Sequence, residues 1–351
     1  MKILMTGANG FLGKKLARDL LKEGHILYLL VRNSKKLNSF IESIESPQMK
    51  SRVNIIEGDV TLNNLGVSEE LQDNLRGELD AIFHMAALLS FDPKDKEKSY
   101  QVNVQGTKNT LEFAKNLSCI KFFYVSTAYT IGLENEGSEK LYSTNRSFVN
   151  NYEETKCLAE HLVSSYQDQM FVNILRPSII IGDSVTGEAD TSFGLYGLLK
   201  SLLVLKRKIS RKDNFRETKF HIMLNTETTA NLVPVDYVST VLVAALQSSE
   251  NGDIFNVTNP YPLKQGDILK IIKDTLELPS LYAIGFDSEH QLREDEKLFN
   301  KPLSAFKSYW GRDIYFPCEN TKELLSKSGK PILNMDDKML SKIISSYIMN
   351  R

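Results

Sequence analysis

The sequence has few of the features that define several protein classes. Its 351 residues include only three cysteines, Cys119, Cys157 and Cys318. None of them forms a CxxC pair, so we predict neither disulfides nor a metal site, and we expect a reducing compartment. Lys and Arg number 43 against 44 for Asp and Glu, which gives no basic excess for binding nucleic acid. No apolar run reaches the roughly 18 residues of a membrane span, and no signal peptide is evident. We therefore expect a cytoplasmic protein.

Short apolar runs alternate with helical patterns through the first half of the chain. Strands are expected at 3–5, 26–31, 53–56, 81–83, 122–125 and 172–175, with helices at 11–21, 102–114 and 152–166. Apolar strands separated by helices are typical of a parallel sheet covered on both faces. The pattern predicts an α/β, doubly wound sheet.

The rhythm changes after about Gly182, where helical and loop-like segments dominate. We expect a nucleotide-binding domain over 1–182, to which 230–260 returns, and a smaller, mostly helical lobe over 183–351 that mainly binds substrate. An apolar stripe on that lobe could line a pocket or belong to the core, and comprises Phe193, Tyr196, Leu199 and Leu203. The charged stretch 206–216 is expected to be a solvated loop.

A glycine-rich loop lies between the first strand and the first helix. Its glycines, Gly7, Gly10 and Gly13, follow the spacing GxxGxxG. The first permits a tight turn, the second allows a pyrophosphate to approach the backbone, and the third packs the helix on the strand. The start of the helix offers free N–H groups to phosphate. We therefore predict dinucleotide binding by this loop, including Asn9, Phe11 and Leu12.

The end of the second strand carries Arg32, where a site that prefers NAD usually has Asp or Glu. Lys35 and Lys36 follow closely. A guanidinium can bind a 2′-phosphate with two hydrogen bonds. We therefore predict that NADP(H) is preferred, with NAD(H) as the alternative.

A YxxxK pair, Tyr152 and Lys156, lies on one face of a predicted helix. A nearby ammonium is expected to lower the tyrosine pKa from about 10 and so to suit Tyr152 for proton transfer to or from a carbonyl oxygen. Thr127, with Ser126 as second choice, ends the fifth strand, where a hydroxyl could donate to the same oxygen.

Taken together, these motifs resemble those of extended short-chain dehydrogenases/reductases of the Rossmann type over about the first 260 residues. The resemblance rests on the loop 6–13, Gly58-Asp59-Val60, His84-Met85-Ala86-Ala87, the segment 103–107, Ser126-Thr127, the YxxxK pair and Arg176-Pro177-Ser178. It implies that Asp59 contacts the adenine with Val60 beside it, and that Ala86 and Ala87 line the dinucleotide. It further implies that Asn103 supports the active-site helix, that Lys156 holds the nicotinamide ribose, and that Pro177 and Ser178 flank the nicotinamide.

The segments 84–92, 151–160 and 176–188 resemble the thioester reductase and fatty acyl-CoA reductase branch. This narrower resemblance implies NADPH-dependent reduction of an acyl thioester, delivered as acyl-CoA or by a carrier protein in trans, with a free aldehyde or ketone as a further substrate class. Two alternatives stay open: a nucleotide-sugar epimerase or dehydratase, and a non-catalytic NADP-binding regulator. A monomer or homodimer is expected.

Overall fold

The computed structural model describes residues 1–351 except 192, 210–218, 302–306 and 350–351. The contacts divide the chain into two units. The first comprises 1–178, 236–258 and 316–332, and the second comprises 179–235, 259–315 and 333–351. The sequence analysis did not foresee that 316–332 packs with the first unit.

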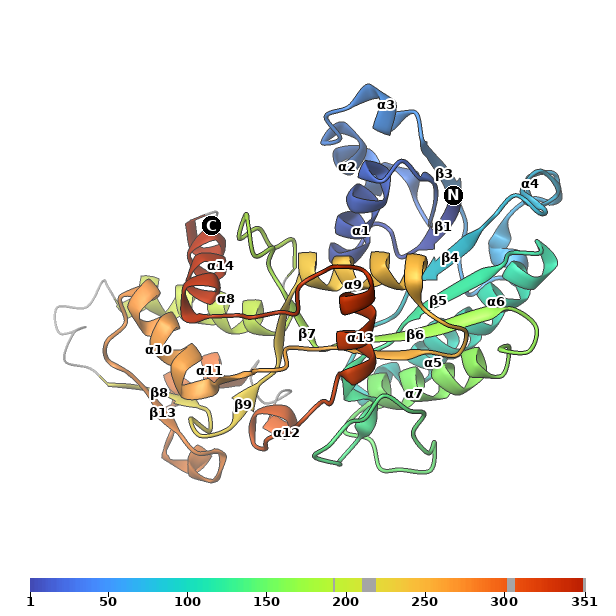
Figure 1. Ribbon diagram of the computed structural model, residues 1–351. Coiled ribbons are helices and arrows are strands. Elements are labelled where there is room, and N and C mark those ends of the chain that lie inside the picture. The colour runs from blue at the N-terminus through green and yellow to red at the C-terminus, as the bar shows by residue number, and fades with distance from the viewer. Residues whose placement is uncertain (192, 210–218, 302–306, 350–351) are drawn as a thin grey trace. The chain divides into compact units, whose positions relative to one another are not determined.

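The first unit is built on a seven-stranded sheet, and the predicted doubly wound fold is confirmed (Figure 1). The strand order is β11-β6-β5-β4-β1-β2-β3, and every pairing is parallel. The strands are β1 Lys2–Thr6, β2 Ile26–Val31, β3 Val53–Glu57, β4 Ala81–His84, β5 Lys121–Val125, β6 Phe171–Pro177 and β11 Ile254–Val257. The order reverses between β1 and β4, which is where such sheets bind ligands.

The helices of this unit cover both faces of the sheet (Figure 1). They are α1 Phe11–Lys22, α2 Asn38–Glu42, α3 Pro47–Lys50, α4 Glu69–Leu75, α5 Lys96–Tyr100, α6 Gly106–Asn116, α7 Asn151–Ser164, α9 Val235–Ser248 and α13 Glu319–Lys327. Further helical segments are η1 Ser34–Leu37, η2 Asn63–Gly66, η3 Pro93–Asp95, the short π-helix η4 Gln101–Gln105 and η5 Ala128–Ile131.

Alternation along the strands builds the core, because successive side chains point to opposite faces. Leu4, Ile82 and Phe122 belong to one buried cluster that also includes Leu111 of α6 and Val163 of α7. On the other face, α1 and α9 are joined by the hydrogen bond from the Ser239 hydroxyl to Asp19, at 2.7 Å. Both faces of the central strands are thus covered, as their continuous apolar runs predicted.

The second unit combines short strand pairs with helices. Its strands are β7 Ile179–Ile181, β8 Phe220–Met223, β9 Thr229–Ala230, β10 Leu232–Pro234, β12 Leu263–Lys264 and β13 Leu281–Ile284. Its helices are α8 Leu195–Ile209, α10 Gln265–Leu276, α11 Glu294–Asn300, α12 Lys307–Trp310 and α14 Asp337–Met349, with η6 Phe286–Gln291. They surround a small apolar interior that includes Tyr196 and Leu199, both fully buried.

Two expectations for this unit need correction. The stretch 206–216 is not wholly a loop, since α8 continues to Ile209, and 210–216 lies outside the described residues. The apolar stripe is divided: Tyr196 and Leu199 are core residues, whereas Phe193 is 59% exposed. Within the described part of the chain, no helix is long and apolar enough to cross a membrane.

Candidate active site

The glycine loop forms a tight cradle between β1 and α1. Gly7 has a φ of +72°, and a Cβ there would lie 2.8 Å from the backbone nitrogen of Ala86. A Cβ on Gly13 would lie 2.4 Å from the carbonyl oxygen of Gly7. These close approaches require glycine. No side chain caps the N-terminus of α1 at Gly10, so the first N–H groups of this helix are available to an anion.

A cavity of about 290 Å³ lies against this loop. Eight residues that the sequence analysis assigned to the cofactor line it together: Gly7, Asn9, Gly10, Arg32, Asp59, Val60, Ala86 and Ala87. Phe11, Leu12 and Gly13 begin the adjoining helix α1. The cavity combines an uncapped helix N-terminus with polar and small apolar walls, and this combination fits a dinucleotide.

The cavity also has a basic residue that the sequence analysis missed. Lys98 of α5 lines it, together with Arg32, whereas Lys36 lies on η1 and is not among the lining residues. No motif marks Lys98, because only the packing of α5 in the folded chain brings it to the cavity. The cavity thus has two basic side chains and one acidic side chain, Asp59.

The buried His84, at the end of β4, connects the end of β1 to the start of α6 through its two ring nitrogens. The Thr6 hydroxyl lies 2.8 Å from His84 Nδ1, and His84 Nε2 lies 3.1 Å from the Thr107 hydroxyl. Thr107 donates to the Asn103 carbonyl, so it accepts from His84, and this assigns the proton to Nε2. Burial, with Lys156 nearby, lowers the pKa of His84 to about 3. His84 is therefore neutral and braces the cavity wall.

Asn103 connects the wall of the cavity to the helix that carries the YxxxK pair. Its amide bonds both backbone groups of Leu88, at 2.7 and 3.1 Å, and donates to the Thr155 hydroxyl at 3.0 Å. Leu88 lines the cavity, and Thr155 directly precedes Lys156 in α7. Asn103 lies in the short π-helix η4, a kind of distortion that is often found at functional sites.

Lys156 is held at the end of β5. Its ammonium donates to the Val125 carbonyl at 2.6 Å and lies 4.2 Å from the ring centre of Tyr124. The residue is 1% exposed, and burial lowers its pKa to about 7, against an opposing effect of Glu160.

Tyr152 differs from the expectation in one respect. Burial raises the pKa of Tyr152 above its ordinary value, whereas the sequence analysis expected Lys156 to lower it. Burial is the cause of the raised pKa, and the Lys156 ammonium donates to the Val125 carbonyl. The Tyr152 ring lies beside Phe91, with centroids 6.4 Å apart. At neutral pH, Tyr152 is therefore a protonated donor.

The hydroxyls at the strand ends are arranged differently from one another. Thr127 accepts from the Tyr129 N–H at 3.3 Å and lies 3.5 Å from the Pro177 carbonyl. The side-chain oxygens of Ser126 and Ser178 are buried and have no hydrogen-bond partner among the described residues. The two proposed catalytic hydroxyls, those of Ser126 and Thr127, follow the carboxyl end of β5. Backbone groups orient the hydroxyl of Thr127.

A buried ion pair joins β6 to α7. Arg176 donates to Glu160 twice, from Nε at 2.8 Å and from Nη2 at 2.7 Å, and both side chains are fully buried. Arg176 also donates to the carbonyls of Ser138 and Lys140. The pair connects α7 to β6. Its carboxylate, on Glu160, lies one turn after Lys156 in α7, and Arg176 lies immediately before Pro177 in β6. The sequence analysis noted Arg176 only as part of a motif.

Among the described residues, no group of three or more His, Cys, Asp or Glu could hold a metal ion. The three cysteines are buried, and burial raises the pKa of the Cys119 thiol to about 12 and those of Cys157 and Cys318 to about 11. They are not activated nucleophiles.

Comparison with known proteins gives one family and a set of relatives. The family model described as "Male sterility protein" matches residues 5–242. Fatty acyl-CoA reductase wat of Drosophila melanogaster is 27% identical over 290 residues, which cover 69% of this chain and 53% of that protein. The chain thus spans about half the length of this curated relative.

Solved structures share the fold. The terminal R domain of the myxalamid PKS-NRPS biosynthetic pathway has a TM-score of 0.81 at 24% identity, covering 99% of this chain and 90% of that one. UDP-glucuronic acid 4-epimerase from Bacillus cereus has a TM-score of 0.71 at 20% identity, with each chain fully covered. At these identities the likeness concerns the fold.

Proposed function

The chain belongs to the male sterility protein family, a branch of the extended short-chain dehydrogenases/reductases, and on this premise we propose that it is an NADPH-dependent reductase of acyl thioesters. One observation carries the proposal. Asn103 hydrogen-bonds both a residue of the nucleotide cavity, Leu88, and the helix of Tyr152 and Lys156 through Thr155. A bound dinucleotide and a proton donor would thereby be held by one set of contacts.

The charges of the cavity support NADPH rather than NADH. Arg32 and Lys98 both line it, and two cations favour the additional phosphate of NADPH over an unmodified ribose. Asp59 is occupied by the N–H and hydroxyl of Thr61, both at 2.9 Å. The preference follows from Coulomb attraction and should weaken as the salt concentration rises.

NADPH, when bound, supplies a hydride to the carbonyl carbon. The residues of this chain stabilise the oxygen that then becomes negative. Tyr152, kept protonated by its raised pKa, would give its proton to that oxygen, and Thr127 would donate a second hydrogen bond. The tetrahedral hemithioacetal then loses its thiol, the C–S bond breaks, and an aldehyde is released. Lys156 and the unpartnered hydroxyl of Ser178 would hold the cofactor in place.

The thioester would reach the site as acyl-CoA or on a carrier protein in trans. The similarity to a non-canonical nonribosomal peptide synthetase, cpsA of Aspergillus campestris, supports a carrier, and that to a fatty acyl-CoA reductase supports acyl-CoA. Both present the same reacting group, so the proposed chemistry is common to them.

Oxidation of NADPH should be measured with octanoyl-CoA, a carrier-bound octanoyl thioester, octanal and UDP-glucose. Thioester-dependent oxidation is expected, and Tyr152→Phe should lower kcat by about 10²–10⁴-fold while NADPH still binds. Tyr100→Phe, at an exposed tyrosine of α5, is the control. Turnover of the aldehyde without either thioester would refute the proposal, and conversion of the sugar nucleotide without net oxidation would favour an epimerase.

A further inference from the structure

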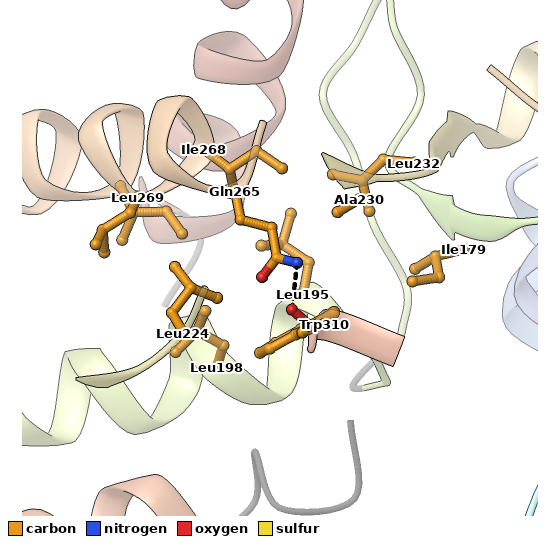
Figure 2. Close-up of a pocket in the computed structure, with 11 residues that line it drawn as sticks. Ile179, Leu195, Leu198, Leu224, Ala230, Leu232, Gln265, Ile268, Leu269 and Trp310 are labelled. Carbon is orange, nitrogen blue, oxygen red and sulfur yellow. Dashed lines mark hydrogen bonds between the residues drawn. The ribbon is translucent and has the colours of Figure 1, made fainter. Parts of the chain in front are cut away.

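Two polar side chains that the proposed chemistry does not use form hydrogen-bond networks, one in each unit. In the second unit, Gln265 of α10 donates to the Thr228 hydroxyl at 2.8 Å and to the Trp310 carbonyl at 2.9 Å. It borders a small apolar pocket together with Leu195 and Leu198 (Figure 2). The innermost space is about 30 Å³, which is room for about one water molecule. The contacts of Gln265 thus serve to join α10 to α12.

In the first unit, Glu139 holds the start of α13, the helix that returns to this unit from late in the chain. Its Oε2 atom accepts from the Asn320 N–H at 2.7 Å. Its Oε1 atom accepts from the N–H and the hydroxyl of Thr321, at 3.2 and 3.1 Å, and from the Asn256 N–H at 2.8 Å. Cys318, which precedes the helix, supplies no side-chain cap. The carboxylate of a distant loop therefore caps α13 and faces the positive end of its dipole.

The backbone on either side of Glu139 is bound to the support of the active-site helix. Arg176 donates to the Ser138 carbonyl at 3.1 Å and to the Lys140 carbonyl at 2.9 Å. The same guanidinium pairs with Glu160 of α7. The loop thus holds α13 with its side chain while its own backbone is fixed by the buried ion pair.

The residues just before α13 contact the turn that follows Thr127. Phe316 is 3% exposed, and its ring meets that of Tyr129 edge to face, with centroids 5.3 Å apart. A Cβ on Gly137 would lie 2.9 Å from the Phe316 ring, so the loop of Glu139 packs closely on the same ring. The Tyr129 N–H in turn donates to the Thr127 hydroxyl oxygen at 3.3 Å. These contacts connect the start of α13 to one of the proposed catalytic hydroxyls.

We propose that Glu139 is a positioning residue for Thr127. By capping α13, the carboxylate keeps Phe316 against Tyr129, and this contact sets the turn whose N–H orients the Thr127 hydroxyl. A carboxylate suits the position because the groups that bond it are all donors, whereas the amide of glutamine would set its own N–H groups against one of them. The inference rests on the proposed function, in which Thr127 donates a hydrogen bond to the reacting oxygen.

Amide hydrogen exchange of the full chain, followed by mass spectrometry, tests the coupling without catalysis. Glu139→Gln should raise exchange by about tenfold in 318–323, where it weakens the cap, and also in 128–132, the turn after Thr127. Phe316→Leu leaves the cap in place and should raise exchange in 128–132 alone. This second variant also decides the matter if the Glu139→Gln protein fails to fold.

Leu325→Ala is the matched control, because it removes a fully buried side chain from α13 and keeps both Glu139 and Phe316. It should destabilise the helix without raising exchange in 128–132. The inference would be overturned if 128–132 kept its protection in both test variants, or if Leu325→Ala exposed that turn as much as Glu139→Gln does.

Kinetics ask whether Glu139 acts through Thr127. With NADPH and octanoyl-CoA, Glu139→Gln should lower kcat by about 10–100-fold while the Kd for NADPH stays unchanged. In the Thr127→Val background the same substitution should have little further effect, because the hydroxyl that it positions is gone. Losses that multiply in the double variant would overturn the inference and leave the reductase proposal standing. If the unmodified protein oxidised no NADPH with a thioester, the proposed function would fail, and the exchange experiment alone would decide whether Glu139 positions Thr127.

Discussion

Replacing Lys156 by Met should make the folded protein more stable at neutral and acidic pH. The ordinary lysine pKa is 10.5, and burial lowers that of Lys156 to about 7. At pH 6 the buried ammonium therefore costs about 5 kcal/mol relative to the unfolded chain. Methionine removes this cost but also removes the donor to the Val125 carbonyl, a loss of about 1–3 kcal/mol. A net gain of roughly 2–4 kcal/mol is expected.

The effect should depend on pH with a definite sign. Below about pH 7 Lys156 is charged in both states, so the cost is fully present. Between pH 7 and 10.5 the unfolded chain binds the proton and the folded chain does not, so the stability of the unmodified protein rises with pH. The advantage of the Lys156→Met variant should accordingly decrease across this range.

Urea unfolding, followed by circular dichroism at pH 6, 8 and 9.5, measures the difference. Lys115→Met, at an exposed lysine of α6, is the matched control and should change stability by less than about 0.5 kcal/mol. If the Lys156→Met variant were less stable than the unmodified protein at pH 6, or if its advantage stayed constant up to pH 9.5, the reasoning would be refuted.

Two further substitutions test the framework of the site. Arg176→Met leaves the fully buried carboxylate of Glu160 unpaired and should cost about 3–5 kcal/mol in urea unfolding. The double variant with Glu160→Gln should recover part of that loss, and additive losses would contradict the ion-pair account. Gly13→Ala places a methyl group 2.4 Å from the Gly7 carbonyl. It should cost about 1–3 kcal/mol and weaken NADPH binding in calorimetry, whereas Gly285→Ala, where the added Cβ meets no atom within 4 Å, should leave both unchanged.

Local patterns in the sequence were sufficient for most of the nucleotide-binding fold. Each of the first six strands was predicted within a few residues. The inner strands are apolar because the sheet buries them on both faces, whereas the edge strand β3 leaves Asn54 and Ile55 exposed. The glycine loop was equally readable, since positive φ at Gly7 and close packing at Gly13 leave little choice of residue. The sequence analysis foresaw eight of the residues that line the cavity.

The environment of the YxxxK pair could not be read in the same way. Spacing places Tyr152 and Lys156 on one helix face, but the pKa of each depends on burial and on what the ammonium meets. The Val125 carbonyl and the Tyr124 ring, which Lys156 contacts, lie about thirty positions earlier in the chain. The expected lowering of the Tyr152 pKa was therefore wrong, while the identity of the pair remains the basis of the proposed chemistry.

The sequence by itself determined the sheet, the glycine-rich turn and the candidate proton donors, because each depends on periodicity or on residues adjacent in the chain. Only the tertiary structure decided that Lys98 rather than Lys36 lines the cavity and that Arg176 pairs with Glu160. It also decided that the side-chain oxygen of Gln265 is buried without a hydrogen-bond partner among the described residues. The physical reason is that burial, charge pairing and hydrogen-bond satisfaction are set by neighbours far away in sequence, which only the packed chain brings together.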